Sequence, residues 1–213
     1  MNTRKLTHKD NVFAEIGKAL RVVTTAAHAR RPNPAEETHD AAMSATEGAQ
    51  SARLMRINHA GEVSAQALYR GQALVARSEA LRSELLQAAE EENDHLAWCE
   101  TRLSELNSQP SIFSPLWYGG SFAIGALAGL AGDKISLGFL AETEQQVTDH
   151  LADHLERLPA GDQRSRKILA RMRDDEERHN KYAIEQGAAE LPKGVKSAMT
   201  LTSKIMTGVA GRI

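Results

Sequence analysis

The sequence predicts an all-α protein, and three observations carry that prediction. Its six prolines leave long stretches without any proline, and a proline inside a helix costs about 3 kcal/mol. These stretches are rich in Ala, Leu, Glu, Gln and Arg, which favour helices. Aromatic residues make up only 4% of the 213 residues, which is low for a β-sandwich or a β-barrel. The proline-free stretches are residues 35–109, 116–158 and 160–191.

The N-terminal part of the chain is predicted to lie outside the main helical domain. Residues 1–50 combine a basic amphipathic segment with a polar linker that we expect to be weakly structured at best. From Arg53 onwards, apolar residues recur with the 3.6-residue period of an amphipathic helix. We therefore assign residues 51–213 to one helical domain, which is long enough to bury a substantial core.

Four long amphipathic helices are expected to make up most of this domain. A break near Ser78 separates the first two helices, and the turn sequence LPAGD around Pro159 separates the last two. Each pair is therefore expected to form an antiparallel hairpin. The four predicted helices cover residues 53–77, 80–107, 134–158 and 162–188.

Two further segments accompany the hairpins. Residues 111–132 carry no charge, but Pro115 and five glycines argue against a membrane-spanning helix. Two alternatives remain open for this segment: a buried helix that packs through Gly125 and Gly129, or a helix that lies in the membrane surface. Residues 195–213 form a last amphipathic segment.

Two Glu-x-x-His pairs stand out because they lie on the apolar faces of firm helices. They are Glu92 with His95 and Glu176 with His179. Residues three apart on a helix point in the same direction, so both members of each pair are expected to face the core. A buried carboxylate is costly unless it is paired or binds a metal.

Each pair has a glutamate counterpart one helix upstream. Glu62 precedes Glu92 by 30 residues and Glu144 precedes Glu176 by 32, with a predicted turn near each midpoint. In an antiparallel hairpin, residues equidistant from the turn lie at the same depth. The two hairpins therefore offer four carboxylates and two imidazoles to one interior, which is the ligand set of ferritin-like di-iron and di-manganese bundles. Such ligands suit iron or manganese.

Other polar residues are weaker candidates. Asp175, and with no better support Asp94, could orient a ligand histidine by accepting its second N–H. His59 lies near the face of the first-helix glutamate and could also support a ligand. His150 and His154 point away from the apolar stripe of their helix. They could support a ligand or lie at the surface, and we expect the surface.

Charge is distributed unevenly along the chain. The net charge of the chain is −2. Residues 1–31 contain seven basic and two acidic residues, and residues 193–213 contain four basic and no acidic residues. The residues between these two ends therefore carry a net charge of −11. The chain thus lacks a global basic footprint for nucleic acid, while its basic ends could contact anionic lipid. The single cysteine, Cys99, is expected in the core, and the first ten residues lack the apolar core of a signal peptide, which favours a reducing cytoplasm.

Five strings in the sequence resemble the bacterial demethoxyubiquinone hydroxylase family. The resemblance covers residues 50–213 well and the first 50 residues loosely, and the HAGE and NDHLAWC strings are specific to the family. It implies a ferritin-like four-helix bundle with additional apolar and amphipathic helices. The strings are RINHAGEVSAQALYRGQAL, EEENDHLAWCETRL, PLWYGGSFAIGALAGLAGDK, AETEQQVTDHL and DDEERH.

The resemblance also implies a metal centre and a reaction. It makes six residues the ligands of two iron ions, with Glu92 and Glu176 bridging them. The reaction is an O2-dependent hydroxylation of a polyprenylated 6-methoxy-3-methyl-benzoquinol in ubiquinone biosynthesis. Since no nicotinamide-binding motif is visible, electrons are expected from the quinol itself or from a partner. The six implied ligands are Glu62, Glu92, His95, Glu144, Glu176 and His179.

The resemblance finally implies a place in the cell. Because the substrate carries a long prenyl tail, the protein is expected as a peripheral protein on the cytoplasmic face of the cell membrane. Its partners would be the prenylated quinol, the membrane surface, and either further copies of itself or a ubiquinone-biosynthesis complex. No nucleic acid is expected among them.

Three other functions fit the sequence less well. A helical adaptor would have no reason to place six ligand-type side chains on apolar stripes. A di-iron hydroxylase that acts on tRNA should show a basic face, whereas the middle of this chain is acidic. An iron-storage cage needs a polar exterior, and the Gly-rich apolar segment argues against one.

Overall fold

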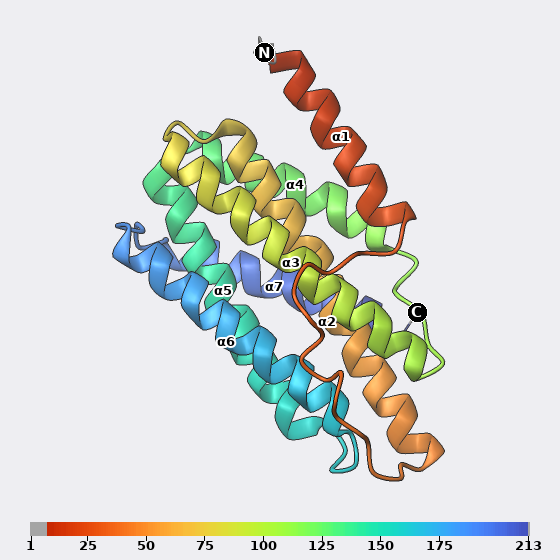
Figure 1. The fold of residues 1–213 in the computed structure, drawn as a ribbon. Coiled ribbons are helices and arrows are strands. Elements are labelled where there is room, and N and C mark those ends of the chain that lie inside the picture. The colour runs from red at the N-terminus through yellow and green to blue at the C-terminus, as the bar shows by residue number, and fades with distance from the viewer. Residues whose placement is uncertain (1–7, 213) are drawn as a thin grey trace.

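The computed structural model describes residues 8–212 and confirms the all-α, ferritin-like prediction. Seven helices and no strand are found in this part of the chain (Figure 1). The first seven residues of the predicted basic segment, and Ile213, lie outside it. The helices are α1 (His8–Thr24), α2 (Ala45–Val75), α3 (Glu79–Glu105), α4 (Ser114–Leu130), α5 (Asp133–Arg157), α6 (Gln163–Glu185) and α7 (Lys193–Ala210).

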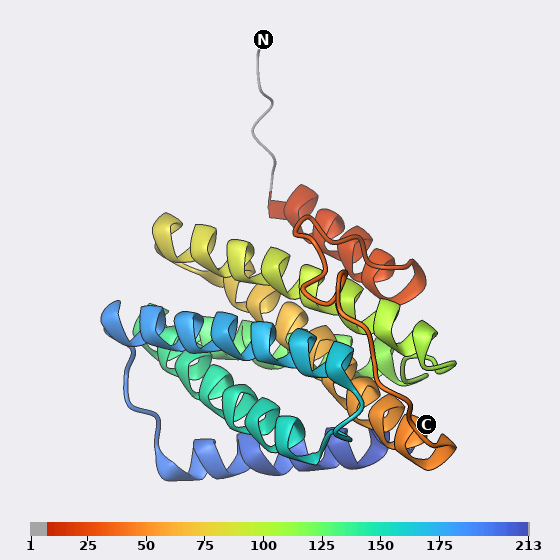
Figure 2. The ribbon, with the colours of Figure 1, turned by 60° about the horizontal axis from the view of Figure 1, so that its bottom comes forward.

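The two predicted hairpins are present as α2–α3 and α5–α6, packed against each other (Figure 2). Side-chain caps fix the start of the second helix in each. The Ser78 hydroxyl accepts a hydrogen bond from the Leu81 N–H, and the Asp162 carboxylate accepts one from the Ser165 N–H. Such caps satisfy N–H groups that the first helical turn leaves unpaired.

The helix α2 begins at Ala45, eight residues before the predicted start. Ser44 and Glu47 form a capping box, in which each side chain bonds the backbone N–H of the other residue. The prediction treated this polar sequence as linker, because it lacks the apolar period that marks the rest of the helix. The proposed boundary at residue 50 consequently falls inside α2.

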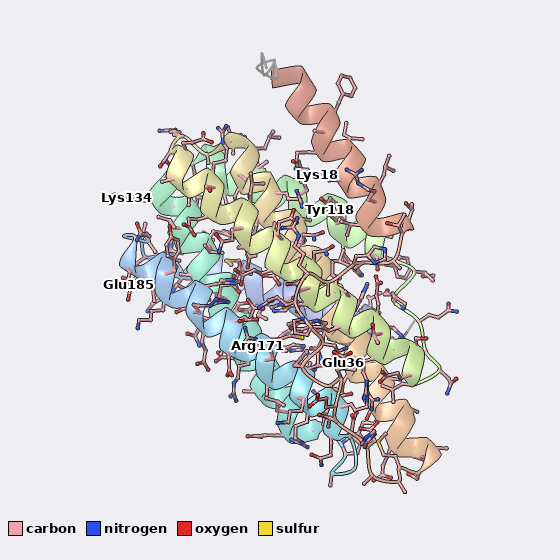
Figure 3. The ribbon with its side chains drawn as sticks, viewed as in Figure 1. Lys18, Glu36, Tyr118, Lys134, Arg171 and Glu185 are labelled. Carbon is pink, nitrogen blue, oxygen red and sulfur yellow. The ribbon has the colours of Figure 1, made fainter. Side chains whose placement is uncertain are left out.

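Residues 25–44, here called the strap, run along the α3–α6 side of the bundle (Figures 1 and 2). The strap lacks regular helix, as expected, but it is firmly attached. Ala35 is fully buried, and Arg31 forms ion pairs with Asp94 at 2.6 Å and Asp175 at 2.7 Å. Figure 3 shows Glu36 on this strap close to α6. The expected weakly structured linker is therefore an ordered part of the bundle.

The apolar segment forms α4, which packs along α2 through glycines. A Cβ atom on Gly125 would lie 2.1 Å from the Leu68 carbonyl oxygen, and one on Gly71 would lie 2.2 Å from that of Phe122. Close approach of this kind is possible only without side chains. None of the described helices is long and apolar enough to cross a bilayer. The other face of α4 nonetheless exposes Leu127 and other large apolar residues.

Two of the three apolar clusters in the described residues lie on either side of a polar layer inside the bundle. One cluster includes Tyr69, Leu85 and Leu140, and the other includes Trp98 and Leu169. Along each of the four bundle helices, the glutamate predicted as a ligand falls between residues of the two clusters. The polar layer is thereby shielded from solvent on two sides by packed hydrophobic residues.

Candidate metal centre

The structure brings all six predicted ligand residues together in this polar layer. They form two overlapping groups, and within each group one donor atom per residue lies within 4.8 Å of the others. Glu92 and Glu176 belong to both groups, whereas the other four residues belong to one group each. The first group is Glu62, Glu92, His95 and Glu176, and the second is Glu92, Glu144, Glu176 and His179.

The donors come from all four bundle helices and are almost completely buried. The four glutamates are at most 2% exposed and His95 is fully buried, while the side chain of His179 is 11% exposed. His95 Nδ1 lies 3.2 Å from Glu62, 3.0 Å from Glu92 and 3.1 Å from Glu176. One ring nitrogen thus faces three carboxylates at once.

The carboxylates of this layer lack the cations that would normally neutralise them. Within residues 8–212, only the two imidazoles lie in ion-pair range of the four glutamates. Burial, and then repulsion from Glu176, raises the pKa of both Glu92 and Glu144 well above the usual range. Although burial opposes it, hydrogen bonding to the carboxylates raises the pKa of His95 and of His179.

A divalent metal pair fits this donor set. One oxygen each of Glu92 and Glu144 is buried without a hydrogen-bond partner among the described residues, and buried polar atoms in native proteins are normally paired. Hard oxygen donors with one imidazole per group suit iron or manganese. Because two carboxylates belong to both groups, two metal ions bound here would share them.

Residues around the six donors hold them in place. Asp175 Oδ2 lies 3.1 Å from His95 Nε2, the ring nitrogen that faces away from the glutamates, and is itself paired with Arg31. The Tyr69 hydroxyl donates a hydrogen bond to Glu144. The expectation for Asp175 therefore agrees with the structure, because a metal-bound imidazole usually donates its second N–H to such an acceptor.

Glu91 is a supporting residue that the sequence reasoning missed. Its Oε2 lies 3.2 Å from His179 Nε2 and 2.8 Å from a guanidinium nitrogen of Arg178. The hydrogen bond with His179 lowers the pKa of Glu91 to about 2, so this carboxylate stays charged. Glu91 lies beside the apolar stripe that selected Glu92, and its contact with His179 depends on the packing of α6 against α3, which the sequence alone does not show.

Three histidines differ from their expected roles, either in how deeply they are buried or in which residue they contact. His154 is fully buried rather than at the surface, and its Nδ1 lies 2.9 Å from Asn58 Oδ1. His150 is partly buried, with its ring centroid 3.9 Å from that of His154. His154 faces α2 because α5 packs against α2 on that side. His59 is buried and pairs with Glu100 at 3.3 Å rather than with the six donors.

An apolar cavity of about 350 Å³ leads from one side of the metal centre to the surface. It lies between α2, α4, α5 and α7, and Glu62 is the one predicted ligand that lines it. A second apolar hollow shares three of its wall residues and extends towards the start of α7. The lining of the first cavity, the one that reaches Glu62, includes Leu68, Ile124, Phe139, Val147, Val195, Met199 and Met206. These walls suit a largely apolar molecule.

A smaller and more polar pocket of about 140 Å³ lies at the His179 side. Glu84, Glu91, Arg178 and Tyr182 line it together with His179. The candidate metal centre therefore has one apolar and one polar approach, from different faces of the bundle.

Comparison with known proteins agrees with this arrangement. The family model described as "Ubiquinone biosynthesis protein COQ7" matches residues 49–210. A 3-demethoxyubiquinol 3-hydroxylase of Xanthomonas campestris is 55% identical over 203 residues, which are 95% of this chain and 94% of that protein. The protein of the same name from Ralstonia pickettii is 53% identical over 215 residues, covering 96% of this chain and 99% of its own length. The chain therefore belongs to the COQ7 family of ubiquinone biosynthesis proteins.

Proposed function

We propose that this protein hydroxylates the ring of a polyprenylated 6-methoxy-3-methyl-benzoquinol with O2, at a carboxylate-bridged pair of iron ions. The observation that carries the proposal is the pair of overlapping donor groups that share Glu92 and Glu176. The relatives named 3-demethoxyubiquinol 3-hydroxylase support the choice of substrate.

In this proposal Glu62 and His95 complete the site of one ion, and Glu144 and His179 complete that of the other. Two ferrous ions, when bound, supply the electrons that activate O2. One oxygen atom enters a ring C–H bond and the other leaves as water, so two electrons and two protons must come from a reductant. This reductant is the quinol itself or a partner.

The chain's own residues prepare the site for that reaction. Asp175 and Glu91 hold the outward nitrogens of the two imidazoles, and this keeps the inward nitrogens aimed at the centre. Tyr69 stays protonated, because burial raises its pKa well above the usual range, and it donates its hydrogen bond to Glu144. The apolar cavity excludes bulk water from the reacting ring.

We also propose that the protein works as a peripheral protein on the cytoplasmic face of the cell membrane. Large apolar side chains are exposed on α4 and α7, beside the cavity and the adjoining hollow. A prenyl tail could pass from the bilayer into the cavity between these helices without crossing water. Leu127 and Leu130 of α4 and Leu201 and Ile205 of α7 are each more than half exposed. Association with further copies or with other biosynthetic proteins stays a prediction.

The proposal is tested by quinone extraction from cells that lack the protein. We expect demethoxyubiquinone to accumulate and ubiquinone to be restored by the wild-type gene. In vitro, the iron-loaded protein with a short-tailed quinol under ¹⁸O2 should yield a product with one ¹⁸O atom in the ring. A normal quinone profile in the deleted cells, or a product without label, would show that the proposed reaction is wrong.

A further inference from the structure

The apolar cavity contains an unexplained polar group, the side-chain amide of Asn58. Asn58 is 2% exposed and lines the cavity from α2. Its Oδ1 accepts a hydrogen bond from His154 Nδ1 at 2.9 Å. Burial, and then the neighbouring His150, lowers the pKa of His154 to about 3, so this ring is neutral. Because Nδ1 faces an amide oxygen, which can only accept, the proton of the neutral ring is assigned to Nδ1. With Oδ1 held by His154, the Nδ2 end of the amide is directed away from this imidazole.

The other end of the same amide is unused. Within residues 8–212, Asn58 Nδ2 has no hydrogen-bond partner, and neither does Nε2 of His150, which lines the same cavity. A buried donor left unpaired costs about 1–3 kcal/mol, and native proteins rarely leave one without a partner or a ligand. The free N–H of Asn58 is therefore a donor available to a ligand that enters this cavity and carries an oxygen acceptor.

The position of Asn58 relates it to the metal centre. Asn58 precedes Glu62 by four residues on α2, which is one helical turn or about 6 Å along the axis. Side chains so spaced lie on the same face of the helix, and both residues line the cavity. If an aromatic ligand placed one ring oxygen at the Asn58 amide, its ring would lie beside the metal centre. The apolar walls of the cavity would then contact the apolar tail of the ligand.

We propose that Asn58 Nδ2 donates a hydrogen bond to a ring oxygen of the quinol and that His154 positions the amide for it. This rests on the quinol hydroxylation proposed above, since it takes the quinol as the occupant of the cavity. Asn58 thereby decides which edge of the ring faces Glu62. His154 acts only through Asn58 and is a positioning residue.

The test compares two ligands on the full-length, iron-loaded protein by equilibrium dialysis. One is a 6-methoxy-3-methyl-benzoquinone with a short prenyl tail, and the other is a prenylated toluene with the same tail and no ring oxygens. In Asn58→Leu we expect the Kd of the quinone to rise about tenfold, which corresponds to one lost hydrogen bond. The Kd of the toluene should stay within about twofold, because its contacts are apolar.

A second variant and a matched control separate positioning from folding. His154→Phe keeps the Asn58 amide but frees its orientation, so the Kd of the quinone should rise by about threefold and that of the toluene should not change. Gln72→Leu makes the same amide-to-leucine change on α2 outside the cavity, where Gln72 bonds Ser136. It should lower stability and leave both Kd values as they are.

The outcomes distinguish this inference from the proposed function. Equal changes for quinone and toluene, or no change in either variant, would overturn the anchoring role of Asn58. A wild-type protein that binds the quinone more tightly than the toluene but forms no hydroxylated product would refute the proposed reaction and leave the anchor standing.

Discussion

At the scale of single residues, the candidate metal centre has two residues that belong to both donor groups. Glu92 contributes to both donor groups, whereas His179 contributes to one. Loss of a shared carboxylate therefore removes an oxygen donor from both sites at once, while loss of one imidazole leaves the other group with its four donors. This asymmetry makes the predicted ligand set testable residue by residue.

We predict that Glu92→Ala loses most of both irons and that His179→Ala loses chiefly one, and that both variants lose hydroxylation. Iron per chain after anaerobic reconstitution and desalting checks this. Glu177→Ala serves as the control, because the Glu177 side chain is 59% exposed and lies next to a predicted ligand. Retention of both irons and full turnover in Glu92→Ala would show that the ligand assignment is wrong.

His154 should make stability depend on pH. Its pKa falls from an ordinary 6.5 to about 3 in the folded chain, through burial first. Below pH 6.5 the unfolded chain therefore binds a proton that the folded chain does not. Stability is complete above pH 6.5 and falls as the pH drops towards 3, by at most about 1.4 kcal/mol per pH unit.

We expect His154→Gln to remove this contribution, because glutamine does not titrate and its amide can still donate to Asn58. The free energy of unfolding of the metal-free protein, measured in urea between pH 5 and 8, should fall less steeply with acid in the variant. An unchanged slope would contradict the buried, neutral state of His154.

At the scale of helices, the four bundle helices and the clustering of the six candidate ligands could be predicted from the sequence, while several features around them could not. The apolar stripes of α2, α3, α5 and α6 carry a strong period, and equal distances from two turns placed Glu62 opposite Glu92 and Glu144 opposite Glu176. The sequence did not predict that α2 begins at Ala45, because its first turns lack an apolar period and are stabilised instead by the Ser44 cap. The burial of His154 depends on packing against α2, which no local pattern reveals.

The α2–α4 contact gives a prediction at this scale. Gly125→Ala should lower the free energy of unfolding by about 1–3 kcal/mol, because the new Cβ would lie 2.1 Å from the Leu68 backbone oxygen, which cannot move aside cheaply. Gly119→Ala on the same helix meets nothing within 4 Å and should be neutral or slightly stabilising. Equal effects of both substitutions on the urea midpoint would refute the close packing of the two helices.

At the scale of the whole molecule, the exposed apolar faces of α4 and α7 lie next to the cavity. We predict that Leu201→Asp with Ile205→Asp weakens sedimentation with anionic vesicles at least about tenfold, since two apolar contacts are lost and two like charges are added. The control carries Ala80→Asp and Ser83→Asp on α3, away from α7 (Figure 2). Equal loss of binding in both proteins would mean that charge alone governs it and that this face is not the contact.

The strap has a consequence for the order of folding. Arg31 joins Asp94 to Asp175, and the second of these contacts spans 144 residues of sequence. Contacts so distant close the largest loops and are slow to form. The guanidinium can bind both carboxylates only after the two hairpins have docked, so it acts as a latch that closes on a finished bundle. Because Arg31 lies 4.9 Å from the centre of the Trp98 ring, tryptophan fluorescence should report this closure as the last step of refolding.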